Sequence, residues 1–145
     1  MIKIGYIDTS FLLSIIFEDE NYELSIDIWN DIEFKYGSVL LEIEARINLY
    51  KYFIKLKNDD VRYLDKQKEL TPLMDSIVKK VMDNEINLEI KNNDKLKRTR
   101  SLDSVHLATA HIINKLTDEK VVVCSYDKEM IKGAKALGLG VIRVS

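Results

Sequence analysis

The chain has 145 residues, of which 46% are hydrophobic and 32% are charged, with five glycines and one proline that leave little room for linkers. This composition excludes a disordered or fibrous protein and predicts one domain, residues 1–145, with a single sizeable core. The formal net charge of −2 gives no global basic field, so a nucleic-acid partner would need local Lys and Arg clusters and metal bound among the acids.

The cysteine count and the apolar segments predict a cytoplasmic protein. Cys124 is the only cysteine and cannot form an internal disulfide, so we expect it to pack as a small hydrophobic residue. The apolar stretch at residues 11–17 is too short to cross a bilayer and lacks the basic leader and small-residue cleavage site of a signal peptide. We therefore expect neither secretion nor membrane insertion.

Segments typical of strands alternate with segments of helical periodicity along the chain. Before residue 60 we predict, in order, a strand at 3–7, a helix from 9 or 10 through 16, a helix at 21–32, a short strand at 37–40 and a helix at 41–57. Thr9 or Ser10 can cap the first of these helices. On the helix at 41–57, the polar side chains share one stripe and the apolar ones recur at helical spacing.

The charged segment at 60–84 predicts two helices that separate at Thr71-Pro72, because proline fits the first turn of a helix and Thr71 can cap it. After it we predict a half-exposed strand at 86–90, a short basic helix at 95–98, a helix at 101–116, a strand at 120–124, a helix at 127–137 and a strand at 141–144. The strand at 120–124 is the most hydrophobic and is expected to lie centrally. This alternation predicts an α/β fold, a three-layer α/β/α sandwich with a mostly parallel central sheet.

Four carboxylates lie where the chain leaves a predicted strand or begins a predicted helix: Asp8, Glu44, Asp103 and Asp127. The carboxyl ends of parallel strands meet at one edge of a sheet, so these side chains are candidates for one site. Carboxylates alone make a site for a hard divalent cation, which is a standard device for hydrolysing phosphodiesters. With 24 acidic residues in the chain, each of the four could instead be a plain helix cap.

Four sequence blocks resemble the PIN domain family. They are Tyr6–Leu13 with Asp8 after the first strand, Ser38–Glu44, Ser101–Ala110 (SLDSVHLATA), which is the most specific, and Ser125–Lys128 followed by Gly138–Val141. Their order and spacing cover essentially the whole chain and are similar to those of small stand-alone PIN domains, the VapC-type toxins of toxin–antitoxin pairs. The resemblance implies a metal-dependent ribonuclease.

In this interpretation the four acids are catalytic and bind Mg²⁺, for which Mn²⁺ can substitute. Asp8 and Asp103 are the expected nearest ligands, and Glu44 and Asp127 would orient waters or a second ion. Glu42 also lies near the expected position in the second block and remains an alternative. Glu44 is assigned by its offset of six residues from Ser38, whereas Glu42 and Arg46 predict an exposed i,i+4 ion pair.

The substrate expected for such a site is single-stranded RNA, and structured RNA is a further candidate partner. Ser10 and Ser125 lie two residues from an acid, where a hydroxyl can fix a carboxylate rotamer or meet a phosphate oxygen. The basic residues that precede Asp103 are candidate RNA contacts or, alternatively, a solvated face; they are Lys91, Lys95, Lys97, Arg98 and Arg100.

The resemblance also implies an antitoxin protein as partner and a homodimer, with the charged segment at 59–80 as a clamp. His106 is expected to be a partly buried structural residue. His111, the only other histidine, points to another side of the same helix, and neither has a His or Cys three or four residues away, which argues against zinc.

Other functions stay open beside the ribonuclease. A PIN-like fold can serve as a non-catalytic RNA- or protein-binding module, a nuclease can act outside a toxin–antitoxin pair, and a site of this kind can cleave DNA. A receiver-like, phosphoryl-accepting domain would want adjacent acids after the first strand, whereas Asp8 is followed by Thr9 and Ser10.

Overall fold

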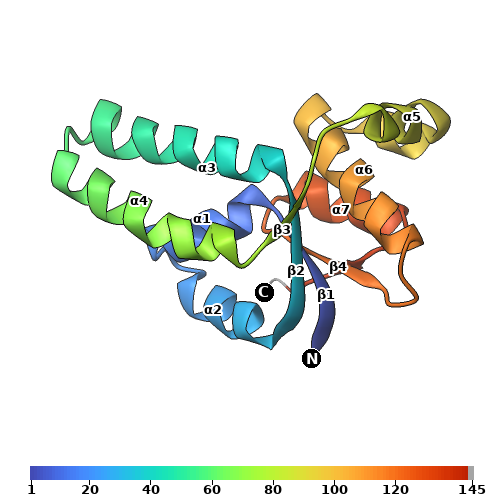
Figure 1. Cartoon of the computed structure of the whole chain (residues 1–145), viewed down its shortest axis with the longest axis horizontal. Coiled ribbons are helices and arrows are strands. Elements are labelled where there is room, and N and C mark those ends of the chain that lie inside the picture. Colours follow the sequence, from blue (N-terminus) through green and yellow to red (C-terminus); the bar gives the residue numbers. More distant parts are fainter. Residues whose placement is uncertain (144–145) are drawn as a thin grey trace.

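The computed structural model describes residues 1–143 and has a five-stranded, all-parallel sheet with helices on both faces (Figure 1). The strand order is β3-β2-β1-β4-β5, with β1 at Ile2–Ile7, β2 at Ile32–Ser38, β3 at Val78–Lys80, β4 at Val121–Cys124 and β5 at Gly140–Val141. The predicted three-layer α/β/α fold is therefore confirmed. Within the described residues, no helix has both the length and the apolar character needed to span a membrane.

The helices form two groups that pack on opposite faces of the sheet. One face is covered by α1 (Thr9–Phe17), α2 (Tyr22–Asp31), α3 (Val39–Tyr50) and α4 (Asp60–Asp75), and the other by α5 (Asn84–Asn92), α6 (Ser101–Lys115) and α7 (Lys128–Ala136). Each face of the sheet has its own hydrophobic core, and neighbouring residues of β1 point into different cores. Ile7 packs with the first group of helices and Tyr6 with the second, and both are fully buried. This alternation is the pleat of a strand that is covered on both faces.

Two short irregular helices complete the fold. The π-helix η1 (Lys51–Leu56) continues α3, and the 3₁₀ helix η2 (Asp94–Arg98) precedes α6. The predicted helix at 41–57 corresponds to α3 together with η1, and the predicted basic helix at 95–98 corresponds to η2. The strand β4 lies inside the sheet between β1 and β5, as its hydrophobicity predicts, although the middle position belongs to β1.

The predicted break at Thr71-Pro72 is wrong, because α4 runs through Pro72 to Asp75. Proline removes one backbone hydrogen bond, but it does so in the last turn of the helix, where the loss is small beside the burial of Leu70 and Met74. The Thr71 hydroxyl donates to the carbonyl of Gln67 instead of capping a new helix. Within the rest of the predicted second helix, which extends to residue 84, Val78–Lys80 forms the edge strand β3.

The predicted strand at 86–90 is also wrong, because these residues belong to α5. The Asp83 side chain caps this helix by accepting a hydrogen bond from the Glu85 N–H. Ile86 and Ile90, four residues apart, both pack on the core beneath α6, whereas Leu88 stays 45% exposed. The same five letters fit a period of two or of four, and tertiary packing selects the second.

Strand boundaries differ from the prediction at two further places. The strand β2 covers Ile32–Ser38, so it begins five residues and ends two residues earlier than predicted. Accordingly, α2 ends at Asp31 and α3 already begins at Val39. The strand β5 covers only Gly140–Val141, and Val144 of the predicted strand at 141–144 lies outside the described residues.

Close contact between α6 and α7 depends on a glycine. A Cβ atom at Gly133 of α7 would lie 2.5 Å from Cδ1 of Leu107 on α6. The absence of a side chain lets the two helices approach, which brings the start of α6 near the start of α7. Asp103 and Asp127 lie at these two starts.

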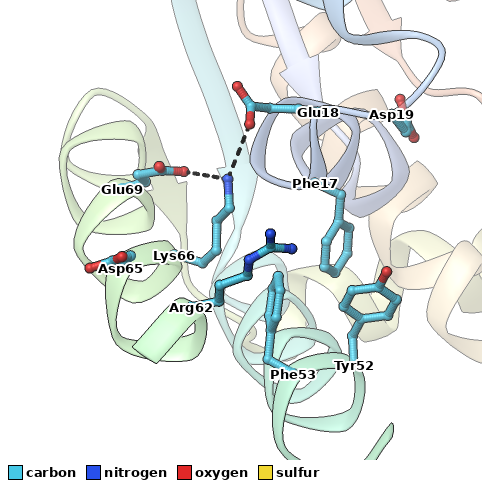
Figure 2. A pocket seen from close by; sticks show the side chains of 9 residues that line it. All are labelled: Phe17, Glu18, Asp19, Tyr52, Phe53, Arg62, Asp65, Lys66 and Glu69. Atoms are coloured by element: carbon cyan, nitrogen blue, oxygen red, sulfur yellow. Dashed lines mark hydrogen bonds and ion pairs between the residues drawn. The ribbon is translucent and has the colours of Figure 1, made fainter. Parts of the chain in front are cut away.

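A cavity of about 720 Å³ opens between the end of α1, η1 and α4 (Figure 2). Aromatic rings of Phe17, Tyr52 and Phe53 lie on one side of it. On the other side, the Lys66 ammonium lies 3.5 Å from Glu18 and 3.1 Å from Glu69. None of the four predicted catalytic acids lines this cavity.

Candidate active site

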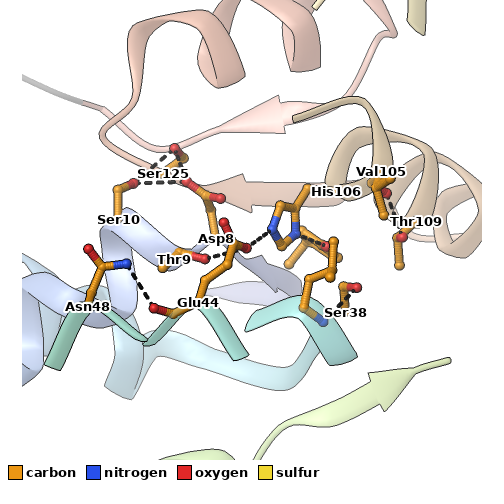
Figure 3. A network of polar contacts seen from close by, with 12 residues as sticks. Asp8, Thr9, Ser10, Ser38, Glu44, Asn48, Val105, His106, Thr109 and Ser125 are labelled. Carbon is orange, nitrogen blue, oxygen red and sulfur yellow. Dashed lines mark hydrogen bonds and ion pairs between the residues drawn. The ribbon is translucent and has the colours of Figure 1, made fainter. Parts of the chain in front are cut away.

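Asp8 follows β1 at the carboxyl edge of the sheet and is only 5% exposed. Its Oδ2 accepts hydrogen bonds from the Ser10 hydroxyl at 2.9 Å and the Ser125 hydroxyl at 2.7 Å (Figure 3). The same hydroxyls accept hydrogen bonds from the backbone N–H groups of Tyr126 and Asp127, both at 3.0 Å. The two serines thus fix the rotamer of Asp8 and join the ends of β1 and β4.

Glu44 reaches the same edge from α3. Its Oε1 lies 2.6 Å from Nε2 of His106 and accepts a hydrogen bond from the Thr9 hydroxyl at 3.0 Å (Figure 3). Nδ1 of His106 in turn lies 2.7 Å from the Tyr6 hydroxyl oxygen. Figure 3 also shows the Asn48 amide donating to the backbone carbonyl of Glu44, at 2.8 Å.

Glu42 is directed elsewhere. Its Oε2 lies 2.9 Å from Nη2 of Arg46, and its Oε1 lies 4.0 Å from Nζ of Lys79. The i,i+4 pair with Arg46 is the one that the sequence predicts. Of the two acids in this block, it is Glu44 whose side chain contacts Thr9, the residue after Asp8.

The contact between Glu44 and His106 shifts both pKa values. Burial alone raises the pKa of Glu44, but the hydrogen bond and charge of His106 and the hydrogen bond from Thr9 outweigh it, so the pKa of Glu44 is lowered. Burial alone lowers the pKa of His106, yet the hydrogen bond to Glu44 and the charges of Asp8, Glu44 and Asp103 raise the pKa above its usual value. Each partner therefore favours the charged form of the other.

Asp103 lies in the first turn of α6, and its Oδ2 is buried without a hydrogen-bond partner among residues 1–143. Nε of Arg100 is 3.4 Å away, an ion-pair distance without hydrogen-bond geometry. Burial raises the pKa of Asp103, and so do the charges of Asp127 and Asp8, against the opposing charge of Arg100. Asp103 is thus close enough to Asp127 and Asp8 to be repelled by their charges.

Asp127 is both a helix cap and a member of this group. Its Oδ1 accepts hydrogen bonds from the backbone N–H groups of Glu129 at 2.9 Å and Met130 at 3.1 Å, which begin α7. Its Oδ2 lies 3.6 Å from Nη2 of Arg100. One guanidinium, on a side chain that is 75% exposed, therefore reaches two of the four acids.

The acids share a pattern in how their oxygens are used. In Asp8, Glu44 and Asp127, one carboxylate oxygen accepts two hydrogen bonds and the other accepts none from the described residues. In Asp103, the buried Oδ2 accepts none from these residues either. Carboxylate oxygens that accept no hydrogen bond in a crowded acidic site are suitable ligands for a hard divalent cation.

The donor set fits a cation that keeps much of its water. Within residues 1–143, no group of three or more His, Cys, Asp or Glu side chains is arranged to hold a metal ion directly. Mg²⁺ dehydrates reluctantly and commonly takes only one or two carboxylates directly, so that other acids contact its waters. Orphaned Oδ2 of Asp103 and the unused oxygen of Asp8 suit the direct role, and Glu44 and Asp127 suit the water-mediated one.

The basic segment before Asp103 divides into three parts. Arg100 pairs with the acids, whereas Nζ of Lys97 donates to the Lys91 carbonyl at 2.9 Å and to Asp94 at 2.8 Å, within and beside η2. Lys95 and Arg98 border a cavity of about 230 Å³ whose further lining residues are Thr99, Glu129, Lys132, Gly133 and Ala136. Nζ of Lys95 also donates to the Ala136 carbonyl at 3.2 Å.

Three residues of the network were not among the predicted site residues. Tyr6 and Thr9 flank the strand end that carries Asp8, and His106 lies three residues after Asp103 on α6. His106 was expected to be structural and partly buried; it is 1% exposed and contacts Glu44. Its place in the SLDSVHLATA block was the one signal available in the sequence, because nothing local links residue 106 to residue 44.

One comparison with known proteins identifies a family for this chain. The family model described as the PIN domain matches residues 5–136, a stretch that contains all four acids. A search of curated proteins found no match. The chain therefore belongs to the PIN domain family, whose members are generally nucleases.

Proposed function

We propose that this chain is a metal-dependent endoribonuclease that hydrolyses phosphodiester bonds of single-stranded RNA. The observation that carries this proposal is the buried Oδ2 of Asp103, which has no hydrogen-bond donor among residues 1–143 and lies near the charges of Asp8 and Asp127. Crowded carboxylates repel one another; Arg100 counters part of this charge from a side chain that is 75% exposed, and a divalent cation would supply a larger counter-charge. Oxygen-only donors favour Mg²⁺, with Mn²⁺ as a substitute.

In this mechanism the four acids have two roles. Asp8 and Asp103 would hold the ion, and Glu44 and Asp127 would orient its waters through their unused oxygens. When bound, the metal lowers the pKa of a water and stabilises charge on the scissile phosphate. Ser10 and Ser125 keep Asp8 in one rotamer, so that its second oxygen points in a fixed direction.

RNA would approach over the basic side of the site. Lys95 and Arg98, together with Lys132 of α7, border the small cavity that is also lined by Thr99, the residue before Arg100. Cations in this position attract backbone phosphates without reading sequence. A single strand can bend its phosphates into an acidic metal site more readily than a rigid duplex, which favours single-stranded RNA.

We further propose that the protein is the toxin of a toxin–antitoxin pair and forms a homodimer. The cavity in Figure 2 combines aromatic rings with four carboxylates and two cations, which suits an antitoxin segment with apolar and basic side chains. On α3, Ile43, Ile47 and Tyr50 form a stripe that is 45–52% exposed. Such a stripe on one helix face suits contact with a second copy.

The function is tested with labelled single-stranded RNA and DNA, incubated with the pure protein and Mg²⁺, Mn²⁺ or EDTA. We expect RNA cleavage that requires the metal and is lost in Asp8→Asn and in Asp103→Asn. Cleavage that EDTA leaves unchanged, or that persists in both variants, would contradict the metal mechanism. Equal cleavage of DNA would favour a DNA-acting nuclease.

The two glutamates of α3, Glu44 and Glu42, provide a matched pair for the same assay. Glu44→Gln should lower cleavage by about 10- to 100-fold, as expected for a residue that orients metal-bound water, whereas Glu42→Gln should leave cleavage unchanged. No cleavage of any RNA by the wild type, together with no calorimetric Mn²⁺ binding, would favour a non-catalytic binding module.

The toxin role is tested separately, by whether expression arrests growth and whether a co-expressed protein from a short adjacent gene relieves the arrest.

A further inference from the structure

The network around Glu44 connects four elements at the carboxyl edge of the sheet (Figure 3). Tyr6 comes from β1, Thr9 from the start of α1, Glu44 from α3 and His106 from α6. The helices α3 and α6 cover opposite faces of the sheet, so the contact of 2.6 Å between His106 and Glu44 joins the two helical layers across the sheet edge.

The protons of the network can be assigned from its geometry. Nε2 of His106 faces a carboxylate oxygen, so it must carry a proton, since a lone pair there would face negative charge. The Tyr6 hydroxyl can then donate to an unprotonated Nδ1 or accept from a protonated one. In either case the hydrogen bond to Glu44 is retained. With the Thr9 hydroxyl, Oε1 of Glu44 accepts two hydrogen bonds.

Burial makes this arrangement rigid. Tyr6 is 0% and His106 is 1% exposed, so neither polar group can exchange its partner for water. The side chain of Glu44 is 25% exposed, which leaves its other oxygen accessible. A glutamate has three side-chain torsions, and anchoring one oxygen from two sides restricts the direction of the second.

We propose that Tyr6 and His106, with Thr9, are positioning residues that hold the carboxylate of Glu44 so that its free oxygen faces the metal site. This rests on the proposed function, because it assumes that the acids bind a divalent cation. Asp8 and Asp127 are short and are anchored by groups within two or three residues or by the adjoining strand end. Glu44, the longest of the four acids, requires an anchor built by the tertiary fold.

The proposal is tested by calorimetric titration of Mn²⁺ into the metal-free protein. His106→Leu removes the donor and should weaken Mn²⁺ binding by about 10- to 100-fold, the usual effect of losing an outer-shell partner. Tyr6→Phe removes only the hydroxyl and should weaken binding by about tenfold. His106→Gln, whose amide can donate from near the position of Nε2, should recover part of the affinity.

A double-mutant cycle separates positioning from a general structural effect. In a Glu44→Ala background, His106→Leu should change the Mn²⁺ Kd by less than about twofold, because the group that it positions is gone. The matched control is His111→Leu, which breaks a His–Glu contact of the same length, 2.6 Å, on the same helix but outside the site. It should leave the Mn²⁺ Kd unchanged.

Kinetics give a second readout. At saturating metal, Tyr6→Phe should lower kcat for RNA cleavage and leave KM within about twofold. The reason is that Tyr6 and His106 are buried, so neither side chain can contact a substrate that approaches from solvent. The positioning role is overturned if folded Tyr6→Phe and His106→Gln bind Mn²⁺ as the wild type does. It is also overturned if His106→Leu loses as much affinity without Glu44, or if the wild type binds no Mn²⁺. A wild type that binds Mn²⁺ but cleaves no RNA overturns the proposed function alone.

Discussion

Helix α6 carries two contacts between histidine and glutamate that have the same length and different surroundings. His106 lies 2.6 Å from Glu44 at the sheet edge, and His111 lies 2.6 Å from Glu89 of α5. Oε2 of Glu89 is taken by Lys115, also at 2.6 Å, so both oxygens of Glu89 bind the protein itself. Glu44 uses one oxygen only. A carboxylate with both oxygens satisfied holds two helices together, whereas one with an oxygen to spare is available to a ligand.

Asp103, whose buried Oδ2 accepts no hydrogen bond from the described residues, should show the largest effect. We expect Asp103→Asn to lower metal-dependent RNA cleavage by at least about a hundredfold. Its pKa is raised by burial and by the charges of Asp127 and Asp8, so the charged form is disfavoured in the fold and contributes instability above its unfolded pKa. In urea unfolding at pH 7, the Asp103→Asn variant should therefore be at least as stable as the wild type. A variant that is inactive because it is unfolded would contradict this interpretation.

The basic residues before Asp103 can be compared in the same way, because some line the small cavity and others pair within the protein. The double substitution Lys95→Ala with Arg98→Ala should raise KM for RNA about three- to tenfold and reduce the salt dependence of KM by about one unit of the log–log slope. Lys97→Ala is the matched control, because Lys97 does not line the small cavity and its ammonium donates to the Lys91 carbonyl and to the Asp94 carboxylate. Equal effects of both changes would mean that the whole segment acts as one nonspecific field.

Glu89 should behave in the opposite way to Asp103, with an effect on stability alone. Burial raises the pKa of Glu89, but hydrogen bonds from Lys115 and His111 outweigh it, so the pKa is lowered from 4.5. Its contribution is therefore complete above pH 4.5 and is lost as the pH falls through the folded pKa. Glu89→Gln should lower the unfolding free energy at pH 7 by about 0.5–1 kcal/mol and flatten the acid side of the stability profile. RNA cleavage should stay at the wild-type level.

Glu42 should show the smallest effect of all. It pairs with Arg46 on a half-exposed face of α3 and does not contact the network around Glu44. We expect Glu42→Gln to leave cleavage unchanged and to shift the unfolding free energy by less than about 0.5 kcal/mol. A loss of cleavage comparable to that of Glu44→Gln would mean that Glu42 also acts at the site, as the alternative acid of the block at 38–44.

Prediction from sequence succeeded where local signals and the family resemblance agreed. The alternating strands and helices gave the three-layer fold, and the element boundaries gave Asp8 at the end of β1 and Asp127 at the start of α7. It failed at Pro72 and at 86–90, where propensity or a short alternating pattern was overruled by burial of Met74 and Ile86. In both places a few letters fit two structures, and only contacts with distant elements distinguish them.

The sequence by itself determined which acids exist, where they stand relative to strands and helices, and which family they resemble. Only the tertiary structure decided how their oxygens are used. Tyr6 and His106 are 100 positions apart, and His106 and Glu44 are 62 apart, so no periodicity or spacing could pair them. Their contact arises because the parallel strands bring α3 and α6 to the same sheet edge, where a buried polar group must find its partner in the folded protein instead of in water.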